Sequence, residues 1–168
     1  MNIWLITDTH FGHDMLIKYG RPDDFTQRIF KNIEVIKTGD MVIHLGDFCI
    51  GKDEHWHNAW FSILPDVKRI LVRGNHDGKS NSWYLDHGWH FICDSFSLKA
   101  FGKKIMFSHY PLAWDGYYDI NIHGHFHDTD HRRLEPQFMK IANGYQKLLA
   151  LEKTNYQPIL LKTFLDNQ

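Results

Sequence analysis

Cysteine is scarce in this sequence: only Cys49 and Cys93 occur in 168 residues. A domain of this length buries enough surface to be stable without cross-links. We therefore expect two reduced thiols, one of them in a strand, and no disulfide framework. The length also fits one domain over residues 1–168.

Charge of one sign is also missing, because 19 Lys and Arg residues face 20 Asp and Glu residues for a formal net charge of −1. Without a general basic field, an extended nucleic-acid surface is not expected. No apolar run approaches the roughly 20 residues that span a bilayer. Met1 leads directly into an apolar segment, with no cationic leader before it. We expect a cytoplasmic protein with no membrane partner, of undetermined oligomeric state.

Proline is rare as well, with 5 residues, while apolar residues make up 43% of the chain. This composition excludes a disordered chain. The aromatic share of 15% predicts a core rich in rings. Histidine is the compositional outlier with 13 residues. The number alone indicates little, but many of these residues directly follow apolar runs.

The first part of the chain alternates between strand and helix patterns. Short apolar runs predict strands over 2–7, 41–45 and 67–72. A helical face precedes the second strand, and a helix over 55–64 stops at Pro65. The first helical face consists of Phe25, Ile29, Ile33 and Ile36, and Gly39-Asp40 is expected to end that helix. Such alternation predicts a largely parallel sheet that gathers ligands at the carboxyl ends of its strands.

The pattern changes after Asp77. We expect a helix over 80–87, capped by Ser80 or Asn81, and a hairpin around Gly102-Lys103. Further predicted segments are hairpin strands over 95–101 and 104–107, a strand over 120–123, a loop over 128–133, and tail strands over 141–143, 148–151 and 159–161. These strands form a second sheet in our interpretation. The predicted fold class is α/β, an α/β/β/α sandwich of two mixed β-sheets flanked by helices.

Five apolar runs end in residues that bind metals. Asp8 and His10 are two apart in extended chain, so their side chains point the same way and can share a cation. Gly46 allows close backbone approach, and the carboxylate of Asp47 can bridge two cations. The other candidate ligands are Asn75, His109, His125 and His127. Such mixed ligation without cysteine favours Mn²⁺, Fe, Zn²⁺ or Ni²⁺ over Ca²⁺.

Taken together, these blocks resemble the calcineurin-like metallophosphoesterase superfamily. The resemblance covers residues 3–127 and rests on Asp8-Thr9-His10, Gly46-Asp47, Gly74-Asn75-His76-Asp77, His109 and Gly124-His125-Phe126-His127. His10-Phe11-Gly12-His13 and Asn155-Tyr156-Gln157-Pro158 are further similar to a compact bacterial and phage subgroup. Asp77 departs from the family, since many members carry Glu there.

The resemblance implies a centre of two divalent transition-metal ions, Mn²⁺ first among the candidates. Asp8, His10 and His127 would hold one ion, Asn75, His109 and His125 the other, and Asp47 would bridge them. A hydroxide between the ions would then attack phosphorus in line. His76 is similar to the family's non-ligand histidine, which stabilises the transition state or protonates the leaving oxygen. Asp77 lies in the same loop as His76 and is assigned to the catalytic group with it. Its expected role is to orient a neighbouring histidine or to bond loop amides.

The resemblance does not determine the substrate. The chain has no room for a cap domain and no basic stripe, so we expect a small phosphodiester such as a nucleotide or cyclic nucleotide. A phosphomonoesterase and a metal-binding interaction scaffold without turnover are the alternatives. Candidate substrate contacts are His13, Asn75, His76 and Arg73. His13 either meets phosphate or caps the turn that follows it.

The remaining basic side chains have ordinary interpretations. We expect His44, His87, His90 and His123 in the core, His55, His57 and His131 in solvent, and Lys79, Arg132 and Arg133 solvated.

Overall fold

The computed structural model describes residues 1–128, Phe138 and residues 144–167. Its first sheet has five strands in the order β4-β3-β2-β1-β9. These strands are β1 Ile3–Ile6, β2 Met41–His44, β3 Lys68–Val72, β4 Phe91–Cys93 and β9 Ile159–Leu160. Strands β1 to β4 are parallel, and β9 runs antiparallel to β1 at the edge. The predicted parallel inner sheet is therefore present.

A second sheet has four strands in the order β5-β6-β7-β8. They are β5 Ser95–Ala100, β6 Lys103–Ser108, β7 Ile120–His123 and β8 Gln146–Leu148. The predicted hairpin joins β5 and β6 in antiparallel register, whereas β6, β7 and β8 are parallel. Both sheets are mixed, as the sequence predicts.

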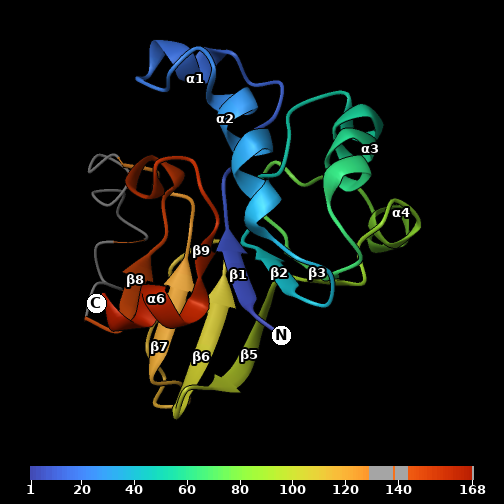
Figure 1. Cartoon of the computed structure of the whole chain (residues 1–168). Helices are drawn as coiled ribbons and strands as arrows, with labels where there is room; N and C mark the ends of the chain where they lie inside the picture. Colours follow the sequence, from blue (N-terminus) through green and yellow to red (C-terminus); the bar gives the residue numbers. More distant parts are fainter. Residues whose placement is uncertain (129–137, 139–143, 168) are drawn as a thin grey trace.

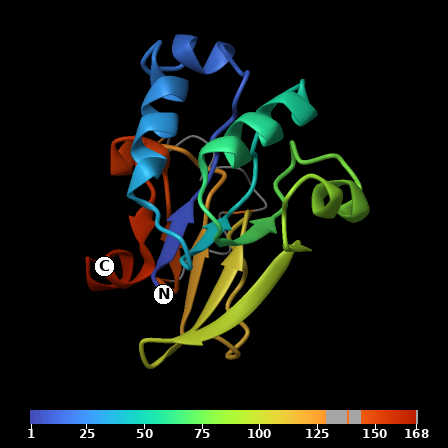
Figure 2. The same cartoon turned by 45° about the vertical axis from the view of Figure 1, so that its right-hand side comes forward.

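Helices flank the sheets and complete the predicted α/β sandwich. They are α1 Met15–Lys18, α2 Phe25–Asn32, α3 Asp53–Ile63, α4 Asn81–Asp86 and α6 Leu161–Asp166, with 3-10 turns η1 Ile33–Val35 and η3 Leu151–Thr154. Figures 1 and 2 show α2, α3 and α4 on one side of the first sheet and strands β5 to β7 on the other. None of the helices described has the length and apolarity needed to cross a membrane.

The first sheet is buried on both faces. Ile6, Val42 and Leu71 belong to a core shared with the helices, whereas their neighbours Leu5, Ile43 and Val72 belong to a core shared with the second sheet. This alternation follows from the period of two in an extended strand. Packing from both sides fixes the strands, so the loops at their carboxyl ends start from rigid positions.

The predicted end of the first helix is wrong. Helix α2 stops at Asn32, the chain continues through a 3-10 turn, and Ile36 is already extended. A 3-10 turn has three residues per turn, so Ile36 still lies over the face of Ile33, and both are buried. The apolar spacing is therefore retained although the α-helix has ended before Gly39.

The tail also differs from its prediction. Strand β8 begins at Gln146, and Leu151 opens a 3-10 turn, so the strand expected over 148–151 lies two residues too late. Leu161 begins helix α6 rather than ending a strand, and it is buried together with Phe164, three residues on. Short apolar runs do not distinguish these alternatives. The strand expected over 141–143 lies outside the described residues.

Two histidine predictions are wrong. His57, expected in solvent, is only 1% exposed because this face of α3 packs against the first sheet's helix-side core. His90, expected in the core, is exposed just before β4. Among the other described histidines, His44 and His123 are buried and His55 is exposed, as expected, whereas His87, expected in the core, is only half-buried. His131, Arg132 and Arg133 lie outside the described residues, and Lys79 is exposed as expected.

Both cysteines are free thiols, as the sequence predicts. Cys93 ends β4, and Cys49 is buried.

Candidate metal centre

Five loops meet at the carboxyl ends of the parallel strands. Asp8, Asp47 and Asn75 follow strands of the first sheet, and His109 and His125 follow strands of the second. The amide of Asp8 donates to the carbonyl of Gly46 over 2.9 Å, and the amide of His125 donates to Asp8 Oδ2 over 3.0 Å. The second bond ties the two sheets together at the site.

Five of the candidate ligands have left-handed backbone conformations. Their φ angles are 49° at Asp8, 47° at His10, 56° at Asp47, 68° at His125 and 52° at His127. Such angles are unfavourable for residues with a Cβ atom and gather at functional sites. The loops are thus bent to point side chains inward rather than to continue the sheet.

Glycines make room for the two carboxylates. A Cβ atom on Gly74 would overlap Asp47 Oδ1, and one on Gly124 would overlap Asp8 Oδ2. Gly46 has a φ of 97°, and a Cβ there would lie 2.7 Å from Nδ1 of His109. Each acidic side chain is therefore packed directly against a glycine of a neighbouring loop.

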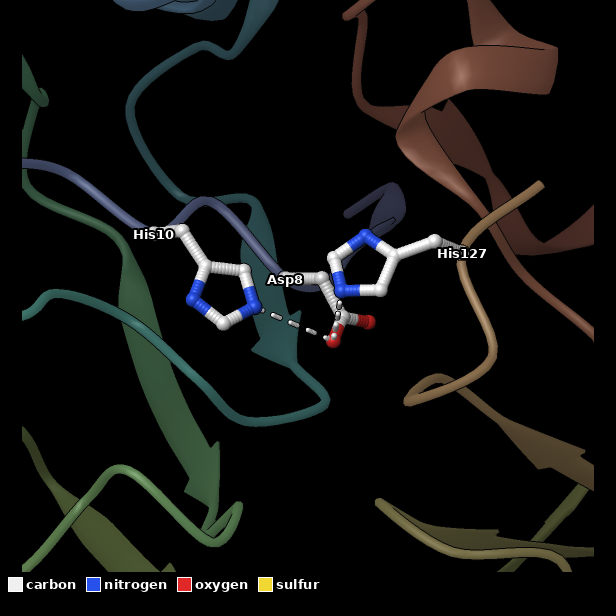
Figure 3. Close-up of side chains that lie close together, drawn as sticks. All are labelled: Asp8, His10 and His127. Carbon is white, nitrogen blue, oxygen red and sulfur yellow. Dashed lines mark ion pairs between the residues drawn. The ribbon is translucent and has the colours of Figure 1, made fainter. Parts of the chain in front are cut away.

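The first ligand group is Asp8, His10 and His127 (Figure 3). Nε2 of each histidine lies 3.7 Å from Asp8 Oδ1. Asp8 Oδ2 is already satisfied, since it accepts from Thr7 Oγ1 over 2.6 Å and from the His125 amide. Asp8 Oδ1 and both Nε2 atoms are buried and have no hydrogen-bond partner among the described residues.

The second group is Asp47, His109, His125 and Asn75. His109 Nε2 lies 3.4 Å from Asp47 Oδ2, 3.1 Å from Asn75 Oδ1 and 3.2 Å from His125 Nδ1. The other nitrogen of His109, Nδ1, lies 2.8 Å from the carbonyl of Leu45. Because a carbonyl only accepts, one ring proton is held at Nδ1, and Nε2 is the nitrogen that faces the group.

Asp47 lies between the two groups. Its Oδ2 atom is 3.5 Å from His10 Nε2 as well as near His109, and it has no hydrogen-bond partner among the described residues. Its Oδ1 atom accepts from the His76 amide over 2.8 Å. Buried carboxylate oxygens without donors are costly unless a cation meets them. Asp8 Oδ1 and Asp47 Oδ2, each surrounded by imidazole nitrogens, therefore fit divalent metal ions.

Electrostatics favour ionised carboxylates in this group. Burial alone would raise the pKa of Asp8 and of Asp47, but the histidines around them lower both below the usual range. Burial lowers the pKa of His10 to about 4, so its ring is neutral. Burial would also lower the pKa of His109, but Asp47 and Asp8 raise it to about 9. In the metal-free protein, a proton on His109 thus offsets part of the negative charge that a cation would neutralise.

Asp77 connects two of the loops by accepting hydrogen bonds from their backbone amides. Its Oδ2 atom accepts from the amides of Asp47 and Gly74, both over 2.8 Å, and its Oδ1 atom accepts from the Phe48 amide over 3.0 Å. Of the roles considered for Asp77, bonding of loop amides is the one that this geometry displays. The carboxylate orients the backbone that carries Asp47.

His76 and His13 border the first ligand group. The His76 side chain is exposed, and its ring centroid lies 5.3 Å from that of His10. The His13 ring is half-buried at 5.5 Å from His10, and its Nδ1 atom has no partner among the described residues. Asp14, not His13, is the cap residue of α1, and no side-chain cap bond is present. The ring of His13 is therefore left facing the site.

A cavity of about 460 Å³ opens beside the second group, lined in part by Asn75, His109 and Arg73. The guanidinium of Arg73 pairs with Asp94 at 2.6 Å. Tyr110, which sequence reasoning missed, donates its hydroxyl hydrogen to Asn75 Oδ1 over 3.1 Å. Its position directly after His109 is the only sequence signal for it.

Comparisons with known proteins identify the family of the chain. The sequence matches the calcineurin-like phosphoesterase family over residues 1–164. The uncharacterized protein MJ1445 of Methanocaldococcus jannaschii is 29% identical, over 95% of this chain and 86% of that protein. The crystal structure of AQ665, a protein of unknown function from Aquifex aeolicus, covers 99% of both chains at 24% identity with a TM-score of 0.75. A solved archaeal phosphodiesterase is 26% identical over 76% of this chain and 74% of its own, with a TM-score of 0.48. The chain belongs to the calcineurin-like phosphoesterase family.

Proposed function

We propose that this protein hydrolyses a small phosphodiester, such as a nucleotide or cyclic nucleotide, with two divalent metal ions. The observation that carries the proposal is a pair of buried oxygens, Asp8 Oδ1 and Asp47 Oδ2, which face histidine nitrogens and have no hydrogen-bond partner in the described part of the chain. Asp8, His10 and His127 would hold one ion, and Asn75, His109 and His125 the other. Asp47 Oδ2 faces both groups and would bridge them.

The donor set also bears on the choice of metal. Carboxylate oxygens, imidazole nitrogens and one amide oxygen suit Mn²⁺, Fe, Zn²⁺ or Ni²⁺, and Mn²⁺ is our first choice. When bound, such ions supply Lewis acidity that activates water and neutralises phosphoryl oxygens. The protein's part is to fix the ligand positions through its strained loops and through the amide bonds to Asp77.

The residues that line the cavity beside Asn75 favour a phosphodiester over a substrate that carries more negative charge. Among its described lining residues, Arg73 is the only lysine or arginine, and Asp94 already pairs with it. A monoester dianion or a second phosphate would favour an unpaired cation there. Tyr110 and Leu112 instead give the cavity an aromatic and an apolar wall suited to an uncharged leaving group.

His76 is the proposed proton donor to the leaving oxygen. Its backbone amide is anchored on Asp47 Oδ1, while its ring stays exposed at the border of the site. An exposed imidazole next to a metal cluster can reach a bound substrate without belonging to the core. His13, 6.3 Å from His76 between ring centroids, is a second group available to contact phosphate.

The test compares substrates and variants in the presence of Mn²⁺. The wild-type protein should bind two ions per chain and hydrolyse bis-p-nitrophenyl phosphate faster than p-nitrophenyl phosphate. Asp47→Ala should lose both ions, while the exposed Asp24→Ala control should keep them. A wild-type protein that binds no metal would refute the centre, and a preference for the monoester would make the protein a phosphatase.

His76→Ala separates a proton donor from a ligand, because His76 also lies within ligand distance of His10 and Asp47. A lost general acid typically costs about 10² to 10⁴-fold in rate. We expect that loss for a diester with an alkoxide leaving group, a smaller loss for nitrophenolate, and an unchanged metal content. Equal losses on both substrates would exclude the acid role, and loss of an ion would make His76 a ligand.

A further inference from the structure

A partly buried ion pair between Arg21 and Glu152 lies next to the first ligand group. Arg21 Nε and Nη2 each lie 2.8 Å from Glu152 Oε1, although the two residues are 131 positions apart in the sequence. The side chain of Arg21 is only 3% exposed. Its guanidinium carbon lies 5.1 Å from the ring centroid of Phe25 and 5.9 Å from that of Tyr156. A guanidinium so enclosed has a fixed orientation.

Arg21 binds the strained loop that carries the first ligand. Nη2 donates to the carbonyl of Asp8 over 2.8 Å, and Nη1 donates to the carbonyl of Thr9 over 3.3 Å. Asp8 has a left-handed conformation, which turns its carbonyl away from the sheet ladder. Buried carbonyls need a donor, and Arg21 provides one for each of these two.

Glu152 binds the other side of the same ligand group. Its Oε1 atom lies 3.2 Å from Nδ1 of His127. Nη2 of Arg21 lies 3.1 Å from the same nitrogen, so the location of the proton must be decided. Nη2 donates one hydrogen to the Asp8 carbonyl, and its other hydrogen lies between Glu152 Oε1, at 2.8 Å, and His127 Nδ1. We assign the proton to His127 Nδ1, which then donates it to Glu152, because a carboxylate only accepts and because Nε2, which faces Asp8 Oδ1, needs its lone pair to bind a metal ion.

We propose that Arg21 and Glu152 are positioning residues of the metal centre, which hold His127 in the Nδ1–H tautomer with Nε2 directed at Asp8 Oδ1. The inference rests on the proposed metal function. Carboxylates that orient ligand histidines in this way typically account for 10- to 100-fold in metal affinity. The arrangement also gives the late segment Asn155-Tyr156-Gln157-Pro158 a function, since Tyr156 covers the guanidinium.

The first readout uses the metal-free full chain and needs no catalysis. Long-range ¹H–¹⁵N correlation spectra distinguish Nδ1–H from Nε2–H imidazole. We expect pure Nδ1–H for His127 in the wild type, a mixture or Nε2–H in Glu152→Ala, and substantial recovery in Glu152→Gln, which keeps an acceptor oxygen. Lys153→Ala is the matched control, because Lys153 lies in the same 3-10 turn and is exposed, with its Nζ atom 3.2 Å from the exposed Asp128.

The second readout is Mn²⁺ binding by calorimetry and electron paramagnetic resonance. We expect Glu152→Ala and Arg21→Ala to lose about 10- to 100-fold in affinity at one site and to convert the coupled two-ion spectrum into that of a single ion. Arg28→Ala, which removes an exposed arginine paired with Asp24, should behave as wild type. An unchanged tautomer with both ions retained overturns the proposal. Equal weakening of both ions together with a fall in melting temperature also overturns it, in favour of a general structural role.

The experiments distinguish failure of the proposed metal function from failure of the positioning proposal. A wild-type protein that binds no Mn²⁺ refutes the metal centre, yet the tautomer of His127 in the metal-free chain still decides whether Arg21 and Glu152 orient that ring.

Discussion

Replacement of His57 by leucine is expected to remove a large acid-dependent loss of stability. His57 lies on the inner face of α3, with its ring centroid 4.3 Å from that of Phe48 and 5.1 Å from that of Trp83. Nδ1 lies 2.8 Å from the Asp53 carbonyl, and Nε2 is buried without a partner among the described residues. Burial lowers the pKa of His57 to about 4.

The direction in which stability changes with pH follows from proton uptake by the unfolded chain. Above pH 6.5 the imidazole is neutral in both states, and it contributes nothing to the pH dependence. Between pH 6.5 and 4 the unfolded chain binds a proton that the folded protein excludes, so stability falls as the pH falls. A pKa of about 4 against the ordinary 6.5 corresponds to about 3 kcal/mol, since each pH unit is worth about 1.4 kcal/mol.

The measurement is urea unfolding of the wild type and of His57→Leu, followed by circular dichroism at several pH values from 7.5 to 4, with chelator present. The acidic and histidine residues of the metal centre titrate in both proteins, so they cancel in the difference. The stability of the variant relative to wild type should rise by about 3 kcal/mol between pH 7 and 4. His55→Leu is the matched control, because His55 is exposed on the same helix two residues away.

Parallel pH profiles for wild type and His57→Leu would refute this reasoning, since they would mean that the buried ring takes up its proton at an ordinary pH. The C–H resonances of His57 provide a direct check, because they should not shift above pH 5.

Three further predictions concern single positions. Gly124→Ala should weaken Mn²⁺ binding by about tenfold or more, measured by calorimetry, because its Cβ atom would displace the Asp8 carboxylate; unchanged affinity would contradict the close packing. Ser80→Ala should lower the stability by about 1 kcal/mol in urea unfolding, because Ser80 caps α4 by accepting from the Trp83 amide. Trp60→Ala should cost about 3 to 5 kcal/mol in the same assay, because Trp60 is fully buried; a loss below 1 kcal/mol would mean that the core collapses around the gap.

Much of the architecture could be predicted because it depends on local periodicity. The apolar runs before Asp8, Asp47 and Asn75 identify buried strands, and the topology of parallel strands brings their ends together. The helix end at Asn32 could not be predicted, because an α-helix and a 3-10 turn keep the same apolar face. His55 and His57 illustrate a related limit: only the packing of α3 determines which of the two is buried.

The residues that contact the candidate ligands from the second layer could not be predicted from sequence patterns. Arg21 and Glu152 lie in segments without recognisable motifs, and their pairing is apparent only once the fold brings the segments together. Tyr110 was missed for a different reason, since a tyrosine after a strand is usually part of the core. Its hydroxyl instead donates to a candidate ligand, Asn75.

The left-handed conformations of five candidate ligands cost the folded protein some stability. A left-handed conformation costs a residue with a Cβ atom roughly 1–2 kcal/mol, a penalty that glycine escapes. Replacing Asp8 or His127 by glycine would relieve this penalty, but it would remove a candidate ligand and, at Asp8, the bond to the His125 amide. The positive φ angles at candidate ligands are thus a backbone feature that could be looked for at loop positions in any structure of this shape.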